Sequence, residues 1–287
     1  MSRFLYSIAW WLALPLVLAR LWRRGRAEPG YRNHLGERFG FYPPLPTDAP
    51  LIWLHAVSVG ETRAAEPLVA ALLAAYPRHR ILLTHMTATG RATGAALFAR
   101  HGERVLQSWL PYDTGWMTRR FLAHFAPRLG LLMETEVWPN LLAQCARRRL
   151  PVALVNARLS QRSLARGLRL PALFGEAAAN LALVAAQTDA DAERIAQLGA
   201  RHVQVTGSLK FDVAPPDDTV ARGAVLRQKF GARPVLLCAS TRDGEEALIL
   251  AALRQSGAAL GDALLVLVPR HPQRFDEAAA QLAEAGL

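Results

Sequence analysis

Cysteine is scarce in this sequence of 287 residues, which contains only Cys145 and Cys238. They lie far apart in apolar surroundings, so they form neither a disulfide framework nor the paired spacing of a zinc site. The eight histidines are scattered and include no HxxxH or HExxH pair. These absences argue against a disulfide-stapled secreted fold. They also leave a metal site without support, so we expect no metal.

Lysine is also nearly absent, because Lys210 and Lys229 are the only two and arginine supplies the remaining positive charge. The net charge of +11 indicates an anionic partner: nucleic acid, anionic lipid or an anionic substrate. A solvated arginine surface is the alternative explanation. The arginines do not alternate with exposed aromatic residues, so we expect no nucleic-acid partner.

One long apolar run stands near the N-terminus, from Phe4 to Ala19, and four arginines follow it within seven residues. A spanning helix needs about 20 apolar residues, so this run can cross as a short helix or lie in the membrane interface. A cleaved signal peptide would carry its positive charge before the run, and a buried core helix is a further alternative. We expect residues 1–30 to be an uncleaved membrane anchor with a basic flank. The positive-inside rule then places the chain beyond Arg20 in the cytoplasm.

Short apolar runs alternate with helical patterns after a proline-rich link at 42–46. The clearest helix is expected over 62–76, where apolar residues recur at helical spacing. This alternation favours the α/β class, with a parallel sheet covered on both faces. The expected strands are 51–55, 80–84, 104–109, 129–133, 152–155, 182–186 and 202–206.

A break at 212–218, which contains two adjacent prolines, separates this region from a second alternation. Strands are expected at 235–239 and 263–268, and helices at 243–256 and 273–285. We therefore interpret residues 31–213 as one Rossmann-like domain and residues 214–287 as the first part of a second. Two such domains facing each other are typical of the GT-B glycosyltransferases. The second region is shorter than the about 100–150 residues usual for such a domain. We therefore expect it to be incomplete and this chain alone to be inactive.

Ligands of open parallel sheets bind beyond the carboxyl ends of the strands, so the residues that follow each expected strand are candidates. Charged candidates are Glu61, Glu134, Glu136, Lys210 and Arg270. Glu61 also suits a first helical turn, where the helix dipole favours a carboxylate but lowers its basicity. An interaction with the dipole of the helix expected from about Pro139 accounts for the presence of one of Glu134 and Glu136 better than for the presence of both.

Two of the candidates, Lys210 and Arg270, are basic. A lysine in a chain that uses arginine nearly everywhere suggests that Lys210 supplies a compact ammonium, although Lys229, in an expected surface helix, shows that a lysine can also be incidental. Arg270 at a strand end suits a phosphate or base contact. The Asp189-Ala190-Asp191 segment has the form of a metal-binding DxD motif. However, Thr188 before it and Glu193 after it indicate the start of a helix.

Taken together, these segments are similar to the family of 3-deoxy-D-manno-oct-2-ulosonic acid (Kdo) transferases, and they occur in order along the whole chain. The matching segments are RLWRRGR, GERFGFY, HAVSVGET, LPYD, METEVWPN, NARLS, AAQT, VTGSLKFD and VPRHPQRF. The resemblance implies a two-domain GT-B enzyme with CMP-Kdo as donor substrate, a lipid A precursor (lipid IVA) as acceptor, and no separate cofactor. It also implies anchorage in the bacterial inner membrane, against anionic lipids, with the catalytic domains on the cytoplasmic face.

The resemblance also implies roles for individual residues. Glu61 matches the family's general base, Glu134 and Lys210 match its transition-state-stabilising residues, and Pro269 and Arg270 match its CMP contacts. The role of Glu136 beside Glu134 stays open, as does the number of Kdo units added. A transferase for another nucleotide sugar is one alternative, and a non-catalytic, basic, membrane-tethered binding protein is another.

Overall fold

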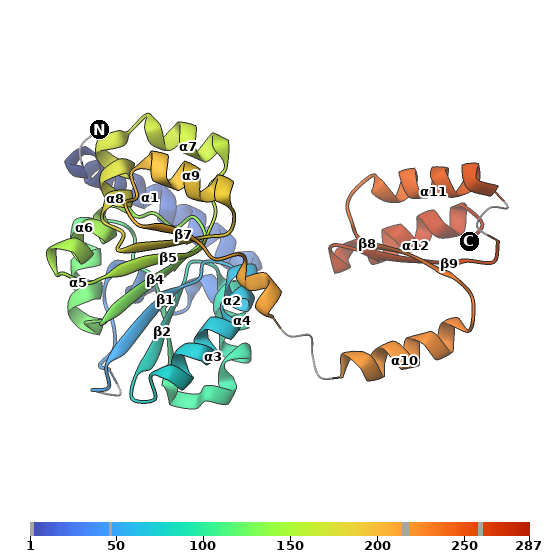
Figure 1. Ribbon diagram of the computed structural model, residues 1–287, viewed down its shortest axis with the longest axis horizontal. Coiled ribbons are helices and arrows are strands. Elements are labelled where there is room, and N and C mark those ends of the chain that lie inside the picture. Colours follow the sequence, from blue (N-terminus) through green and yellow to red (C-terminus); the bar gives the residue numbers. More distant parts are fainter. Residues whose placement is uncertain (1–2, 46–47, 214–217, 258–260) are drawn as a thin grey trace. The chain divides into compact units, whose positions relative to one another are not determined.

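The computed structural model describes residues 3–45, 48–213, 218–257 and 261–287. The chain divides into two compact units, Met1–Ala214 and Pro215–Leu287, which are described separately (Figure 1). Pro46 of the first expected link and residues 214–217 of the second lie outside the described residues.

The N-terminal unit is built on one seven-stranded, wholly parallel sheet with the order β3-β2-β1-β4-β5-β6-β7. Every expected strand is present, with bounds that differ from the prediction by at most two residues. The strands are β1 Leu51–His55, β2 Arg80–His85, β3 Val105–Trp109, β4 Leu129–Met133, β5 Val152–Ala157, β6 Leu183–Ala186 and β7 Val203–Val205.

Helices cover both faces of this sheet, as the strand–helix alternation predicts (Figure 1). One face is covered by α2 Val59–Ala64, α3 Glu66–Ala75 and α4 Ala88–Leu97. The other is covered by α5 Gly115–Phe125, α6 Pro139–Arg147, α7 Gln161–Leu168, α8 Glu176–Ala179 and α9 Asp189–Leu198. The short helical turns of this unit are η1 Pro29–Arg32, η2 Leu35–Phe39, η3 Ala99–Arg104, η4 Pro171–Gly175 and η5 Leu209–Asp212.

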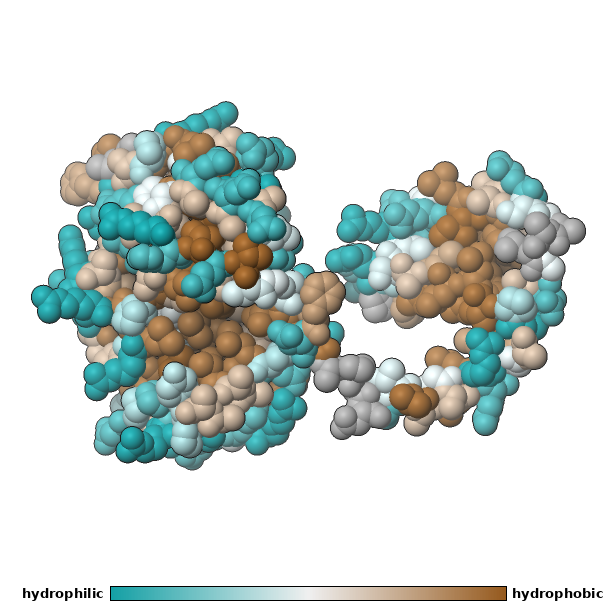
Figure 2. Space-filling model, viewed as in Figure 1, coloured by the Kyte–Doolittle hydropathy of each residue, from teal (hydrophilic) through white to brown (hydrophobic). Residues whose placement is uncertain are grey.

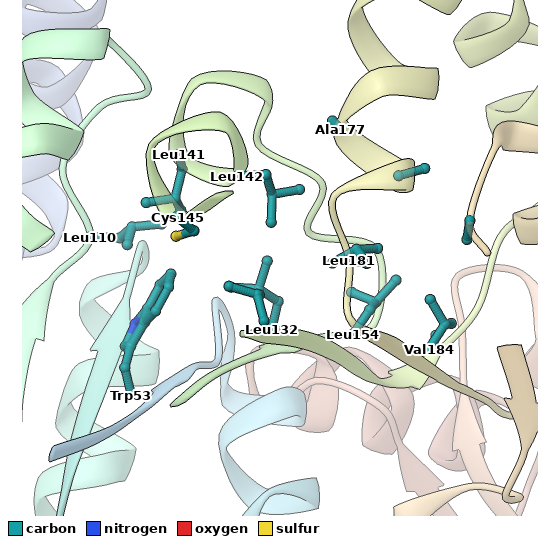
Figure 3. Close-up of a cluster of buried hydrophobic side chains, with 14 of the residues drawn as sticks. Trp53, Leu110, Leu132, Leu141, Leu142, Cys145, Leu154, Ala177, Leu181 and Val184 are labelled. Carbon is teal, nitrogen blue, oxygen red and sulfur yellow. The ribbon is translucent and has the colours of Figure 1, made fainter. Parts of the chain in front are cut away.

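The two faces are visible in the alternation of side chains along β1. Trp53 belongs to one buried cluster, whereas Ile52 and Leu54 belong to the other. Such double burial explains why the strand reads as an unbroken apolar run in the sequence. In Figure 3, Trp53, Leu132, Leu154 and Val184 rise from the strands toward Leu141, Leu142, Cys145 and Ala177 of the covering helices.

The ring of Trp53 leaves no room for a side chain at Gly130 in β4. A Cβ added at Gly130 would lie 2.9 Å from Trp53 Cε3 and 3.2 Å from Val152 Cγ2. The ring cannot move aside easily, because it is fully buried and its Nε1 donates to Thr84 Oγ1 at 2.8 Å.

We therefore expect Gly130→Ala to lower the free energy of unfolding of this unit by about 1–3 kcal/mol, the usual cost of overpacking. Urea unfolding followed by tryptophan fluorescence measures it. Gly115→Ala is the control, since its Cβ would meet Gln144 Nε2 at an ordinary 3.8 Å. Equal stability of the two variants would show that the packing around Trp53 is loose.

The expected single helix over 62–76 is wrong, because two helices occupy this region. Ser58 caps α2, which begins at Val59, and the chain breaks at Ala65 before α3 starts at Glu66. Pro67 lies in the first turn of α3. A proline has no N–H and clashes with the carbonyl four residues earlier, so a continuous helix cannot pass through this position.

Helix α1, Arg3–Ala27, is long and apolar enough to cross a membrane by length and composition. One face of it nevertheless packs against the N-terminal unit. Leu14 forms a small buried cluster with Tyr112 and Met117, and Ser7 bonds to Asn140 at the start of α6. The opposite face exposes large apolar side chains, among them Phe4, Trp11, Leu12, Leu16 and Trp22.

The C-terminal unit contains a two-stranded parallel sheet, β8 Val235–Thr241 and β9 Leu264–Pro269. Its helices are α10 Thr219–Phe230, α11 Glu245–Ser256 and α12 Phe275–Glu284, with the turn η7 Pro272–Arg274. Several of its apolar side chains are exposed, with Leu237 60% and Leu248 71% accessible. Figure 2 shows hydrophobic side chains gathered over the sheet of this unit.

Candidate active site

The carboxyl ends of β1 and β4 lie side by side in the middle of the large sheet. From β1 the chain continues through α2 and α3 on one face, and from β4 through α6 on the other. The connections therefore diverge here, and such a switch point leaves a crevice where open α/β sheets bind their ligands. Glu61 follows β1 and Glu134 follows β4, so the fold brings these two candidates to the same point.

Glu61 is held in one orientation by a capping box at the start of α2. Ser58 Oγ accepts the Glu61 N–H at 3.4 Å and donates to Glu61 Oε1 at 3.0 Å. The N–H of Val57 donates to Glu61 Oε2 at 2.8 Å. Glu61 therefore has the structural role expected of a carboxylate in a first helical turn. The same hydrogen bonds fix the positions of its two carboxylate oxygens.

Burial raises the pKa of Glu61, and the negative charge of Glu134 acts in the same direction, although the donors on Val57 and Ser58 oppose them. The net shift is upward, so the effect of burial exceeds that of the donors at the helix start. A half-buried carboxylate with raised basicity has the properties of a general base.

Glu134 is buried and has an unusual backbone conformation. Its φ of 56° lies in the left-handed region, which non-glycine residues rarely adopt. Its Oε2 pairs with Arg158 Nε at 3.0 Å, and its carbonyl accepts the Arg158 N–H at 3.4 Å. Such strain costs about 1–3 kcal/mol and persists where the surroundings fix the residue, often at functional sites.

A third carboxylate, Glu136, joins this cluster. Trp138 Nε1 donates to Glu136 Oε2 at 2.7 Å, and the same oxygen lies 3.9 Å from His55 Nε2. Burial raises the pKa of Glu136 to about 7, with further contributions from the charges of Glu61 and Glu134. Glu136 was a candidate without a role. His55 was not predicted as a site residue, although it is the only polar residue of β1 and stands at the carboxyl end of that strand.

Lys210 lies in the turn η5, which packs against α2 and α3 at the same edge of the sheet as Glu61. The turn is attached to the end of β5, because Asn156 Oδ1 accepts the N–H of Leu209 at 3.1 Å. Asn156 also adopts the left-handed backbone conformation, with a φ of 52°. It lies at an irregularity in the pairing of β5 with β6. The side chain of Lys210 is exposed to solvent.

Asn156 and Arg158 were not singled out as site residues from the sequence. Both follow the expected strand 152–155, so the rule that ligands bind at strand ends was the signal that pointed to them.

Pro269 and Arg270 belong to the C-terminal unit, at the end of β9. Pro269 is buried, whereas the side chain of Arg270 is exposed and its N–H donates to the Thr241 carbonyl at 2.9 Å. Nearby, both oxygens of the buried Glu246 accept from Arg274 at 3.0 Å. These bonds lower the pKa of Glu246 and join η7 to α11, and Glu246 also accepts from Thr241 Oγ1 at the end of β8 at 2.7 Å.

Within the described residues, no group of three or more histidine, cysteine, aspartate or glutamate side chains is placed to hold a metal ion. Asp191 of the DxD-like segment has a capping role, as the residues around it predicted. Thr188 is the N-cap of α9, and Asp191 accepts from the Thr188 hydroxyl and the N–H of Leu159. Its oxygens are thus used within the fold.

The fold resembles those of two solved enzymes. A UDP-GlcNAc 2-epimerase from Neisseria meningitidis superposes with a TM-score of 0.57 over 82% of this chain and 69% of its own, at 13% identity. A glycosyltransferase from Rickettsia africae superposes with a TM-score of 0.53 over 84% of this chain and 66% of its own, at 11% identity. The fold is therefore the α/β fold of the GT-B glycosyltransferase type, as predicted.

The chain belongs to the Kdo transferase family. The family model of 3-deoxy-D-manno-octulosonic-acid transferase (kdotransferase) matches residues 33–213. A 3-deoxy-D-manno-octulosonic acid transferase from Bordetella pertussis is 50% identical over all of this chain and 68% of its own length. One from Haemophilus influenzae is 37% identical over 96% of this chain and 65% of its own length. The chain therefore spans about two thirds of the length of these relatives.

Proposed function

We propose that this protein transfers Kdo from CMP-Kdo to the lipid A precursor lipid IVA in lipopolysaccharide biosynthesis. Membership of the Kdo transferase family supports the reaction class. The observation that carries the proposal is the placement of Glu61 at the switch point. Its side chain is half-buried, is oriented by hydrogen bonds from Val57 and Ser58, and has a raised pKa.

The proposed step is an inverting displacement. Glu61 takes the proton from an acceptor hydroxyl, and the oxygen forms a bond to the anomeric carbon of Kdo. The bond from that carbon to the phosphate oxygen breaks, and its electron pair leaves with CMP. Lys210 offsets the negative charge that develops on the phosphate. Glu134, held by Arg158, faces the positive character of the sugar ring.

A donor assay tests this proposal against its rivals. The full-length protein in membranes should release CMP from CMP-Kdo when lipid IVA is present, and it should release no UDP from UDP-GlcNAc. Release of UDP alone would assign the site to another nucleotide sugar. Binding of lipid without release of either nucleotide would point to a non-catalytic tethered protein.

We also propose that α1 holds the protein at the cytoplasmic face of the inner membrane, against anionic lipids. Its exposed face carries Leu12 and Leu16, each 75% accessible, while its other face is packed against Tyr112 and Met117. Arginines at its C-terminal end add attraction to anionic headgroups. Because one face of α1 packs on the protein, the helix suits attachment in the plane of the membrane interface through its other face.

Leu12→Glu combined with Leu16→Glu should weaken binding to anionic vesicles by roughly 100-fold or more, since burial of each leucine is worth about 1.5–3 kcal/mol. Vesicle sedimentation measures the change. Val220→Glu, at a position in α10 that is 84% accessible, is the control and should leave binding unaltered. Undiminished binding of the double variant would assign the attachment to another surface.

A further inference from the structure

The hydrogen bond that Val57 donates to Glu61 comes from a peptide group that is also held at its other end. The N–H of Val57 donates to Glu61 Oε2 at 2.8 Å. The carbonyl oxygen of the same peptide group, that of Ala56, accepts from His85 Nδ1 at 2.9 Å. One end of this peptide group therefore binds the proposed base, and the other end binds a histidine at the end of β2.

His85 is the donor in this bond and is fixed in place. A carbonyl oxygen only accepts, so Nδ1 carries the hydrogen and Nε2 has the lone pair. Nε2 has no hydrogen-bond partner among the described residues, so the bond to Ala56 is the one that orients the ring. Gly94 of α4 lies against the ring, because a Cβ added there would come within 2.9 Å of Nε2.

The ring of His85 is neutral near neutral pH. Burial lowers its pKa to about 4, and the charge of Arg91 acts in the same direction, while the bond to Ala56 opposes them. The neighbouring His55 is neutral as well, since burial lowers its pKa to about 3. The donor at Nδ1 of His85 therefore stays the same over the pH range in which the enzyme would be assayed.

The next peptide group along the chain is held by Thr87. The hydroxyl of Thr87 donates to the carbonyl oxygen of Val57 at 2.8 Å, and its N–H donates to the same oxygen at 3.2 Å. The hydroxyl also accepts the N–H of Gly90 at 3.2 Å, as the N-cap of α4. His85 and Thr87 thus bind the two successive carbonyl groups of the loop that leads from β1 into α2.

Glu61 lies among charged groups that oppose one another. The negative charge of Glu134 raises its pKa and Arg158 lowers it, and Glu61 in turn raises the pKa of Glu136. Lys210 is exposed in η5, which packs on α2. Among the described residues, hydrogen bonds to the two oxygens of Glu61 come only from the loop before α2. The geometry of that loop therefore controls how readily Glu61 ionises.

We propose that His85 and Thr87 are positioning residues for Glu61, which hold the loop before α2 so that the N–H of Val57 points at the carboxylate. This proposal rests on the proposed function, in which Glu61 is the base. The bond from His85 also polarises the peptide group, so it strengthens the bond that Val57 donates. A stronger donor favours the ionised carboxylate, which is the form that accepts a proton. Ionisation of Glu61 therefore forms the acid limb of the pH profile.

The test compares Thr87→Val with Thr87→Ser in the full-length protein. Valine keeps the shape of threonine but has no hydroxyl, so the loop should lose part of its support. The bond from Val57 lowers the pKa of Glu61, so a weaker bond raises that pKa and moves the acid limb to higher pH. On that limb kcat/KM should fall by roughly tenfold, the effect of one hydrogen bond to a charged group, and on the plateau much less. Serine keeps the hydroxyl and should keep the wild-type profile.

Thr188→Val is the matched control, because it removes the hydroxyl that caps α9, and it should leave the acid limb unaltered. His85→Asn and His85→Leu form a second pair. The amide of asparagine can donate to the Ala56 carbonyl in place of Nδ1, whereas leucine cannot, so the acid limb should move in the leucine variant alone. Valine and leucine variants that lose thermal stability but keep the wild-type acid limb would overturn the proposal.

A titration without substrate separates the failure of this proposal from that of the proposed function. Carbon-13 NMR of the full-length protein with labelled glutamate identifies the Glu61 carboxyl by its absence from Glu61→Gln. The pKa of that carboxyl should be higher in Thr87→Val than in the wild type and in Thr87→Ser. An unaltered pKa would refute the positioning role, whatever reaction the protein catalyses. A raised pKa with unaltered kinetics would support the positioning role and count instead against Glu61 as the base.

Discussion

Glu61→Gln should lower kcat by roughly 10²–10⁴-fold, the usual contribution of a positioned general base. The amide keeps the size of the side chain. Its oxygen can accept from the Val57 N–H, and its NH2 group, which replaces the oxygen that accepted from Ser58, can donate to Ser58 Oγ instead. It cannot take a proton from the acceptor hydroxyl. Steady-state kinetics on the full-length protein, with CMP-Kdo and lipid IVA, measure the effect.

The control for this loss is Glu66→Gln. Glu66 is the first residue of α3, the helix that follows α2. Its Oε1 pairs with Nη2 of the exposed Arg100 at 2.8 Å. Affinity for CMP should be the same in both variants, because we propose that Arg270 of the C-terminal unit contacts CMP. Turnover of Glu61→Gln close to that of the control would leave Glu61 with its capping role alone.

Lys210→Ala should lower kcat by roughly 10²–10³-fold, as removal of one charge-stabilising donor does in other enzymes. The turn η5 should keep its place, because it is held by the bond from the Leu209 N–H to Asn156 and by its packing on α2 and α3. Lys210→Arg should also be impaired, since a planar guanidinium does not replace a compact ammonium at a phosphate.

Lys229, in the last turn of α10, supplies the matched control. Lys229→Arg makes the same chemical change on a surface helix and should not alter kinetics. If the two arginine variants are equally active, Lys210 contributes no more than a general positive charge.

The strands could be located from the sequence because parallel strands covered on both faces read as continuous apolar runs. The rule that ligands bind at carboxyl ends then selected Glu61, Glu134 and Lys210, and the fold places all three segments at one edge of the sheet. Neither step required knowledge of the strand order. The order adds that β1 and β4 are neighbours, which brings the two glutamates to the same crevice.

Other features depend on contacts that a linear pattern does not contain. The approach of Glu136 Oε2 to within 3.9 Å of His55 Nε2 brings together residues about 80 positions apart and follows from the pairing of β1 with β4. The break between α2 and α3 was readable at Pro67, but the apolar periodicity across it favoured one helix. Whether α1 stands free or packs on the unit could not be predicted, because its two faces are similarly apolar in the sequence.

Mass spectrometry of the lipid product tests the central claim most directly. Lipid IVA incubated with CMP-Kdo and membranes containing the full-length protein should gain the mass of one or more Kdo residues. The same membranes containing Glu61→Gln should leave nearly all of the lipid unmodified. Lipid IVA that stays unmodified with the wild-type protein, or gains a different sugar from another nucleotide donor, would contradict the assignment of this protein as a Kdo transferase.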